Sequence, residues 1–127
     1  MIRAVICDDE MASHSIIRYL IENEGLPIEI VGTAVNGQSS LELIQREQPD
    51  LAFLDIQMPK LDGFEVLQKL RESKTKVIFI TVYNTFAYAQ KALRLGACDI
   101  IEKPIDVTQL KEAIIRAIGW NFTENET

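Results

Sequence analysis

The chain has 127 residues, of which 47% are hydrophobic and 25% are charged, so its length and composition suit one globular domain with a core of its own. Its formal net charge of −6 argues against a domain that is drawn as a whole to nucleic acid or to an anionic membrane. The apolar runs are strand-sized and no charged-then-apolar leader opens the chain, so the sequence predicts neither a membrane span nor a secretory signal. Two cysteines, Cys7 and Cys98, favour a reduced, cytoplasmic protein over a disulfide framework.

Apolar runs alternate along the chain with segments of helical period. The strands predicted in chain order are residues 4–7, 28–34, 51–55, 76–82 and 98–101, and the helices that follow them are 11–24, 39–47, 63–71, 86–95 and 110–119. Gly25 gives the first helix its stop signal, and Asp62 with Glu65 forms a capping box at the third. A second capping box is predicted at Asp106 and Gln109, before the last helix.

Five strand-helix repeats predict an α/β fold with a mostly parallel sheet that is covered on both faces. The strands are continuous runs of Val, Ile, Leu and Phe, as a doubly covered sheet requires. We assign residues 1–119 to this one domain. Residues 120–127 are polar and acidic, which is typical of a frayed end or the start of a linker.

Polar residues follow several of the predicted strands at the point where each strand ends. They are Asp8, Asp9 and Glu10 after the first strand, Asp55 at the third, Thr81 at the fourth and Lys103 after the fifth. Ligands of such sheets bind beyond these carboxyl ends, so we expect the residues to meet at one rim. Acids that converge repel one another and therefore take up protons or bind a cation, and oxygen ligands suit Mg²⁺. For Asp8 or Asp9 alone, capping of the first helix is the alternative.

Other phosphate chemistries are disfavoured. Neither a GxGxxG nor a GxxxxGK[ST] motif occurs, so the sequence does not predict a nucleotide-binding loop. A Mg²⁺-dependent phosphatase of the haloacid dehalogenase type would need a second acid two residues after Asp55, where Gln57 stands. His14, the only histidine, falls on the first predicted helix and is expected at its surface or in a groove.

Four stretches, VICDDE, LAFLDIQMPKLDG, VIFITVYN and IIEKPI, resemble the signature stretches of bacterial response-regulator receiver domains. The resemblance runs from about Ile2 to Gly119. It implies a flavodoxin-like, doubly wound five-stranded parallel sheet in the order 2-1-3-4-5 with five helices. It also implies a phosphorylation switch in two-component signalling rather than a turnover enzyme.

The resemblance implies a role for each residue at the rim. Asp55 matches the phospho-acceptor. The expected cofactor is Mg²⁺, with Mn²⁺ as a substitute, bound by Asp9 and Asp55, through water by Asp8, and by the backbone carbonyl of Gln57. Lys103 matches the lysine that pairs with a phosphoryl oxygen, and Thr81 matches the hydroxyl that reorients to bind another.

Further positions follow from the same resemblance. Gln57 and Tyr83 flank the path of the hydrolytic water and are expected to tune dephosphorylation, with Tyr83 shielding the phosphoryl group. The peptide bond before Pro104 is expected to be cis. The chain departs from the family at Ile100, where a Tyr or Phe usually switches its orientation, so the usual aromatic readout is in doubt.

The implied partner is a sensor histidine kinase, with a homodimer through the fourth helix, fifth strand and fifth helix, and no membrane partner. DNA binding is expected only through an output domain beyond Thr127, of the AraC or LytTR type, with transcription as the output. The alternative is a stand-alone or degenerate receiver that acts as a protein-interaction module without phosphorylation; the complete set of acids argues against it.

Overall fold

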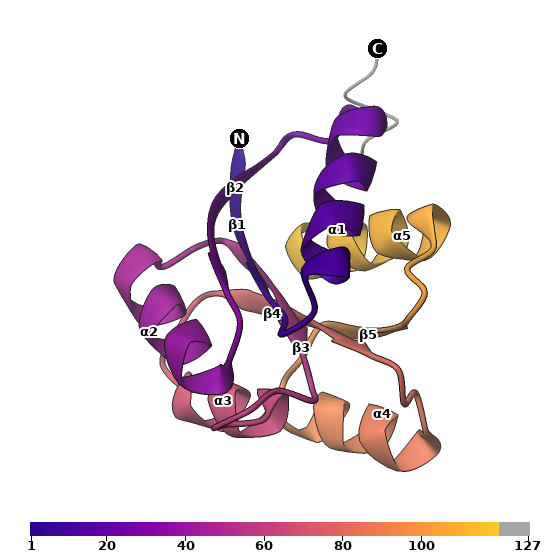
Figure 1. Cartoon of the computed structure of the whole chain (residues 1–127). Helices are drawn as coiled ribbons and strands as arrows, with labels where there is room; N and C mark the ends of the chain where they lie inside the picture. The colour runs from indigo at the N-terminus through magenta and orange to yellow at the C-terminus, as the bar shows by residue number, and fades with distance from the viewer. Residues whose placement is uncertain (120–127) are drawn as a thin grey trace.

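Five strands form one parallel sheet in the order β2-β1-β3-β4-β5 in the computed structural model, which describes residues 1–119 (Figure 1). The elements in chain order are β1 (Ile2–Cys7), α1 (Met11–Asn23), β2 (Ile28–Ala34), α2 (Gly37–Glu47), β3 (Leu51–Asp55), α3 (Gly63–Lys69), β4 (Lys76–Thr81), α4 (Phe86–Arg94), β5 (Asp99–Glu102) and α5 (Val107–Ile118). The predicted fold and strand order are confirmed.

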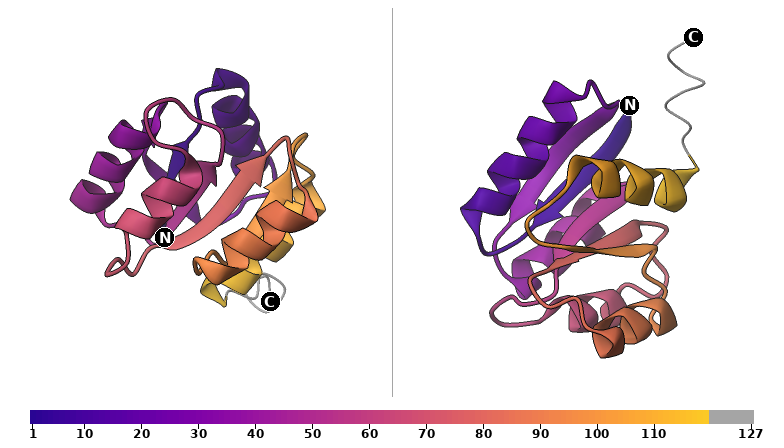
Figure 2. Two further views of the ribbon diagram at one scale, coloured as in Figure 1. Left: turned by 90° about the horizontal axis from the view of Figure 1, so that it is seen from below. Right: turned by 90° about the vertical axis from the view of Figure 1, so that its right-hand side faces the viewer.

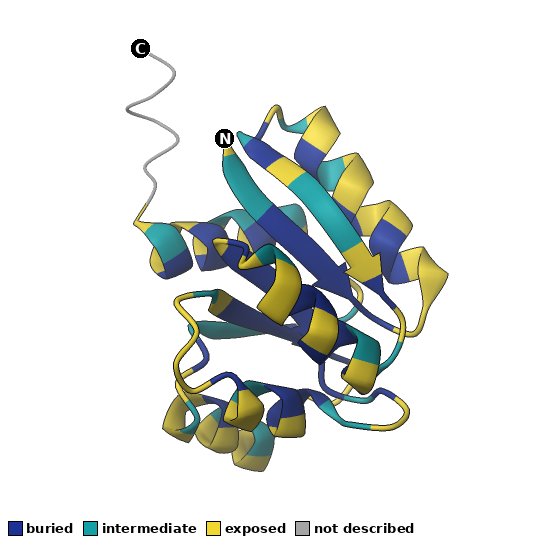
Figure 3. Ribbon diagram, turned by 90° about the vertical axis from the view of Figure 1, so that its left-hand side faces the viewer, coloured by how far each residue is buried: buried dark blue, intermediate teal, exposed yellow. Residues whose placement is uncertain are grey.

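Helices cover both faces of the sheet (Figure 2). Successive side chains of a strand point to opposite faces, so each strand feeds two cores. In β3, Ala52 and Leu54 join a core under α2, α3 and α4, whereas Leu51 and Phe53 join a core under α1 and α5. All residues of β3 are buried (Figure 3), which is why its sequence is a continuous apolar run.

The helix ends follow their capping residues closely. The Asp62 carboxylate accepts from the Glu65 amide at 2.8 Å, and Glu65 Oε1 accepts from the Asp62 amide at 3.1 Å, so the predicted capping box is present. Asp106 accepts from the Gln109 amide at 3.0 Å and caps α5 with its side chain. The last helical residue of α3 is Lys69, two residues earlier than predicted.

Among residues 1–119 no helix is both long and apolar enough to cross a lipid bilayer. The tail predicted at 120–127 lies outside the described residues.

Candidate functional site

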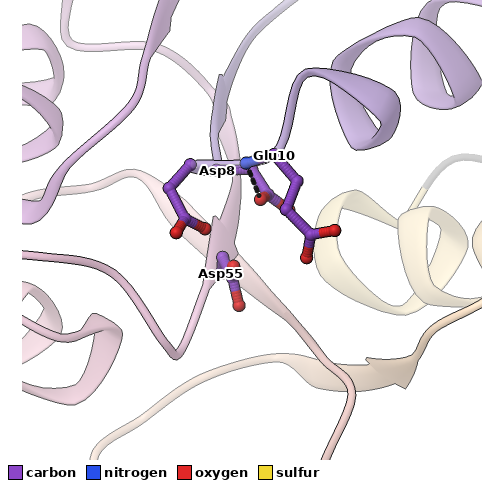
Figure 4. Close-up of side chains that lie close together, drawn as sticks. Asp8, Glu10 and Asp55 are labelled. Carbon is purple, nitrogen blue, oxygen red and sulfur yellow. Dashed lines mark hydrogen bonds between the residues drawn. The ribbon is translucent and has the colours of Figure 1, made fainter.

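Four carboxylates lie together where β1 and β3 end. Asp8, Asp9 and Glu10 follow β1, Asp55 ends β3, and one oxygen of each lies within 4.8 Å of the others. Asp8 and Asp55 are 0% and 3% exposed, whereas Asp9 and Glu10 are exposed. Figure 4 shows Asp8, Glu10 and Asp55 at this edge of the sheet. The convergence of acids expected from the strand ends is therefore present.

Lys103, which follows β5, supplies the positive charge that these acids share. Its Nζ lies 2.9 Å from Asp8 Oδ2, 2.9 Å from Glu10 Oε1 and 3.5 Å from Asp55 Oδ2. The Lys103–Pro104 peptide bond that precedes α5 is cis. Glu10 is thus a member of the cluster and a partner of Lys103.

Protonation at the site reflects burial and charge together. Burial and, to a lesser extent, the negative charge of Asp8 raise the pKa of Asp55 from an ordinary 3.8 to about 7, although Lys103 and the backbone amide of Gln57 oppose the rise. Burial lowers the pKa of Lys103, but its contacts with Asp8, Glu10 and Asp55 outweigh that effect and the pKa is raised. Near neutral pH, Lys103 is charged and Asp55 is held partly protonated.

The backbone and side chain of Asp8 are fixed from several sides. Its amide donates to the Ala34 carbonyl at 3.0 Å, and its Oδ1 accepts from the Glu10 amide at 2.8 Å. Its own carbonyl lies 2.8 Å from Nε2 of His14, which donates because a carbonyl can only accept. Neither Asp8 nor Asp9 caps α1, whose N-cap residue is Glu10 and has no side-chain capping bond.

The expected surface position of His14 is wrong, since the side chain is only 3% exposed. His14, Ile17 and Ile21 are all buried in α1 and recur at helical spacing, so the histidine lies on the inner stripe of the helix. That spacing was the signal in the sequence that could have placed it.

Thr81 ends β4 and is fully buried. Its hydroxyl donates to Gln57 Oε1 at 2.9 Å and accepts from the Tyr83 amide at 3.0 Å. The Gln57 side chain in turn donates to the Tyr88 hydroxyl at 3.3 Å. Tyr88 packs against the core under α2, α3 and α4 and makes this polar contact as well.

The remaining predicted positions lie near the site with less direct contacts. Tyr83 is 58% exposed, so the ring does not enclose the pocket as a buried side chain would. Ile100 is half-buried and packs against the core under α2, α3 and α4. The backbone carbonyl of Gln57 as a metal ligand stays a prediction.

The donor set fits a hard divalent cation. The carboxylate oxygens come from two strand ends, two of the acids are exposed enough to leave room for water, and the cluster carries more negative charge than Lys103 can neutralise. Oxygen ligands with retained water are the coordination that Mg²⁺ prefers.

The parallel sheet thus presents acids at the ends of β1 and β3, a hydroxyl at the end of β4 and a lysine after β5 on one edge of an α/β domain. The family described as the response regulator receiver domain matches residues 4–115, and the chain belongs to this family. An uncharacterized response regulatory protein of Yersinia pestis is 38% identical over 117 residues, which cover 91% of this chain and 48% of that protein. The chain spans about half the length of such curated relatives.

Two solved structures show the same fold. A DNA-binding response regulator of the LuxR family from Staphylococcus aureus matches with a TM-score of 0.83 and 28% identity, covering 92% of this chain and 98% of that one. A CheX-CheY-BeF3-Mg²⁺ complex from Borrelia burgdorferi matches with a TM-score of 0.83 and 25% identity, covering 90% and 87%. Receiver domains bind Mg²⁺ at an acidic pocket, and the response regulators that contain them are phosphorylated by histidine kinases.

Proposed function

We propose that Asp55 accepts a phosphoryl group from the phosphohistidine of a sensor kinase and that this switches the surface of the domain. The observation that carries the proposal is the position of Lys103 Nζ, 2.9 Å from Asp8 and Glu10 and 3.5 Å from Asp55. The positive charge of Lys103 beside the buried Asp55 reduces the repulsion that a carboxylate meets when it attacks an anionic phosphoryl group.

The transfer needs the ionised form of Asp55. A carboxylate oxygen of Asp55 forms the new O–P bond, the P–N bond of the phosphohistidine breaks, and its electron pair stays on the imidazole nitrogen of the kinase. Lys103 neutralises charge on the oxygens of the transferred group, and Thr81 supplies a hydrogen-bond donor from the next strand end.

Mg²⁺ would be held by Asp9 and Asp55, by Asp8 through water and by the carbonyl of Gln57, with Mn²⁺ as a substitute. When bound, the cation neutralises charge on the phosphoryl oxygens and favours ionised Asp55 against the burial and repulsion that raise its pKa. The side chains of this chain provide the oxygen ligands and the position of the attacking atom.

The output and its partners are part of the same proposal. The curated relatives are about twice as long as this chain, and the Staphylococcus aureus relative is described as DNA-binding. We expect transcriptional output through a DNA-binding segment outside these residues, of the AraC or LytTR type, in a cytoplasmic protein.

Incubation with Mg²⁺ and either a phosphorylated kinase or acetyl phosphate tests the transfer. Intact-protein mass spectrometry should show one added phosphoryl group that hydroxylamine removes, as for an acyl phosphate. Asp55→Asn should abolish the addition. Asp50→Asn is the matched control, because Asp50 lies at the opposite end of β3, where its carboxylate accepts from the Arg3 amide at 2.9 Å.

Wild-type protein that stays unmodified under both donors would contradict the proposal and favour an interaction module without phosphorylation. Modification that persists in Asp55→Asn would place the acceptor elsewhere.

The lifetime of the phosphoryl group depends on Gln57 and Tyr83. Tyr83→Ala should shorten the phospho-Asp55 half-life and leave the affinity for Mg²⁺ nearly unchanged, because on this proposal the ring borders the in-line path of the water and Tyr83 is not one of the metal ligands. The decay of labelled protein measures this half-life. An unchanged half-life would assign no shielding to Tyr83, whose side chain is 58% exposed.

A further inference from the structure

A chain of hydrogen bonds leaves the site and ends on α4. The Tyr83 amide donates to Thr81 Oγ1 at 3.0 Å, and the Thr81 hydroxyl donates to Gln57 Oε1 at 2.9 Å. The side-chain amide of Gln57 then donates from Nε2 to the Tyr88 hydroxyl at 3.3 Å. Thr81 is fully buried at the end of β4, whereas Tyr88 lies in the first turn of α4. The chain therefore connects the strand ends with a peripheral helix.

The Thr81 hydroxyl can donate one hydrogen bond, and it donates it to Gln57 Oε1. Asp55 pairs with Ile80 in the β3–β4 register, which puts Thr81 next to the end of β3. A phosphoryl group on Asp55 would add acceptor oxygens beside this hydroxyl. Because hydrogen bonds to ionised acceptors are about twice as strong as neutral ones, the Thr81 hydroxyl would redirect its hydrogen bond from Gln57 Oε1 to a phosphoryl oxygen. Gln57 would then lose the hydrogen bond from Thr81 that orients its side-chain amide toward the Tyr88 hydroxyl.

Helix α4, where this series of hydrogen bonds ends, has few buried residues. Among the residues of α4 only Ala92 is buried, and Phe86 and Leu93 are 82% and 71% exposed. The Tyr88 ring packs edge-to-face on Phe64, with 5.4 Å between ring centroids. An element with so few buried contacts opens or shifts at low cost, so one hydrogen bond can bias its position.

The neighbouring strand offers no comparable polar route. Ile100 of β5 is half-buried against the same core as Tyr88, and its aliphatic side chain has neither a donor nor an acceptor. For residues 1–119, the hydrogen bond from Gln57 is the polar contact that the structure gives the Tyr88 hydroxyl.

We propose that Tyr88 is a positioning residue that acts through Gln57 on Thr81, and that release of this contact transmits occupancy of Asp55 to α4. The inference rests on the proposed function, because it requires a phosphoryl group or its analogue on Asp55. It gives this chain a readout that does not need an aromatic side chain at position 100.

Beryllium fluoride with Mg²⁺, which mimics a phosphoryl group on a carboxylate, provides the probe, and amide NMR shifts provide the readout. In the wild type, the amides of Gln57 and Tyr83 at the site and those of α4 should all shift on loading. Tyr88→Phe removes the hydroxyl and keeps the ring on Phe64. Its site amides should still shift, while the shifts in α4 fall to less than half of the wild-type values.

Two further variants sharpen the comparison. Gln57→Met removes the middle of the chain at similar side-chain length and should reduce the α4 response as Tyr88→Phe does. Tyr19→Phe removes a hydroxyl from a 62% exposed tyrosine of α1 and should behave as the wild type. Full α4 shifts in Tyr88→Phe with a loaded site would overturn the inference alone. Wild-type site amides that do not move with beryllium fluoride would overturn the proposed function and the inference with it.

Discussion

His14 connects the inner stripe of α1 to the acidic residues that follow β1. Its Nε2 donates to the Asp8 carbonyl at 2.8 Å, and its Nδ1 is buried without a hydrogen-bond partner among residues 1–119. A buried polar atom without a partner opposes folding, so the histidine is a compromise between packing and polarity. The hydrogen bond from His14 fixes the backbone at Asp8, directly before the exposed acid Asp9.

Replacing His14 with Leu should lower the free energy of unfolding by about 1–3 kcal/mol, because the buried Asp8 carbonyl loses its donor. Urea unfolding measures the loss. His14→Gln is the control, since its amide nitrogen reaches about as far as Nε2 and keeps the donor; it should lose less. Equal losses in both variants would mean that shape, rather than the hydrogen bond, is what the site requires.

Asp55 should make the metal-free protein less stable as the pH rises. Its pKa in the folded state is about 7 against an ordinary 3.8, so the folded state binds more protons than the unfolded state between these values. The stabilisation is fully present below pH 3.8 and is lost as the pH rises through about 7. Denaturant unfolding in EDTA should show a decline on the order of 4 kcal/mol from this group.

Asp55→Asn removes the titrating group and should flatten that decline and stabilise the metal-free protein at pH values above the raised pKa.

Mg²⁺ at a hundredfold excess over its dissociation constant should add about 2.7 kcal/mol to the free energy of unfolding of the wild type, and Asp9→Asn should lose most of this gain. Stability that is indifferent to Mg²⁺ in the wild type would contradict a metal site among these acids.

At the scale of elements, α3 begins where its backbone passes the end of β3. A Cβ on Gly63 would lie 2.6 Å from the Asp55 carbonyl oxygen and 2.9 Å from the Ile56 Cα, both backbone atoms. The Gly63 amide also donates to the Ile56 carbonyl at 2.8 Å, so the approach cannot widen without breaking this bond. The glycine therefore sets the distance between α3 and the strand that carries Asp55.

Gly63→Ala should destabilise the fold by about 1–3 kcal/mol or more, as overpacking against backbone does. Gly32→Ala is the matched comparison, because the atoms nearest to its Cβ would belong to the Leu43 side chain, with Cδ1 at 2.6 Å, and that side chain can rotate. Thermal or urea unfolding should rank Gly63→Ala as clearly the worse of the two. The reverse order would mean that the start of α3 adapts more easily than its contacts indicate.

The sequence predicts elements better than it predicts contacts between them. Apolar runs, the capping residue Asp62 and the stop at Gly25 depend on neighbours in the chain, so strand and helix positions follow from local pattern. The convergence of Asp8, Asp55 and Lys103 also follows, because parallel strands end at one edge. The bond from His14 to the Asp8 carbonyl and the bond from Gln57 to Tyr88 depend on how helices pack on the sheet. The spacing of residues along the sequence does not predict such hydrogen bonds between elements.

At the scale of the whole molecule, the face made by α4, β5 and α5 combines exposed apolar groups with a fixed ion pair. Phe86 and Leu93 are seven residues apart on α4, which puts them on one side of the helix. They are 82% and 71% exposed. Arg116 of α5 donates from Nε to Asp99 of β5 at 2.9 Å and ties the two elements together. A pair of apolar side chains is small beside the roughly 800 Å² that each partner buries in a stable interface.

The domain should therefore be a monomer at micromolar concentration without a phosphoryl group, and a dimer through this face when beryllium fluoride and Mg²⁺ reposition α4 to complete the surface. Sedimentation velocity measures the change. Leu93→Glu should keep the loaded protein monomeric, because dimerisation would bury an unpaired charge. Tyr19→Glu puts the same charge on a 62% exposed residue of α1 and should leave dimerisation intact. If Leu93→Glu dimerises as the wild type does, the interface lies on another face of the molecule.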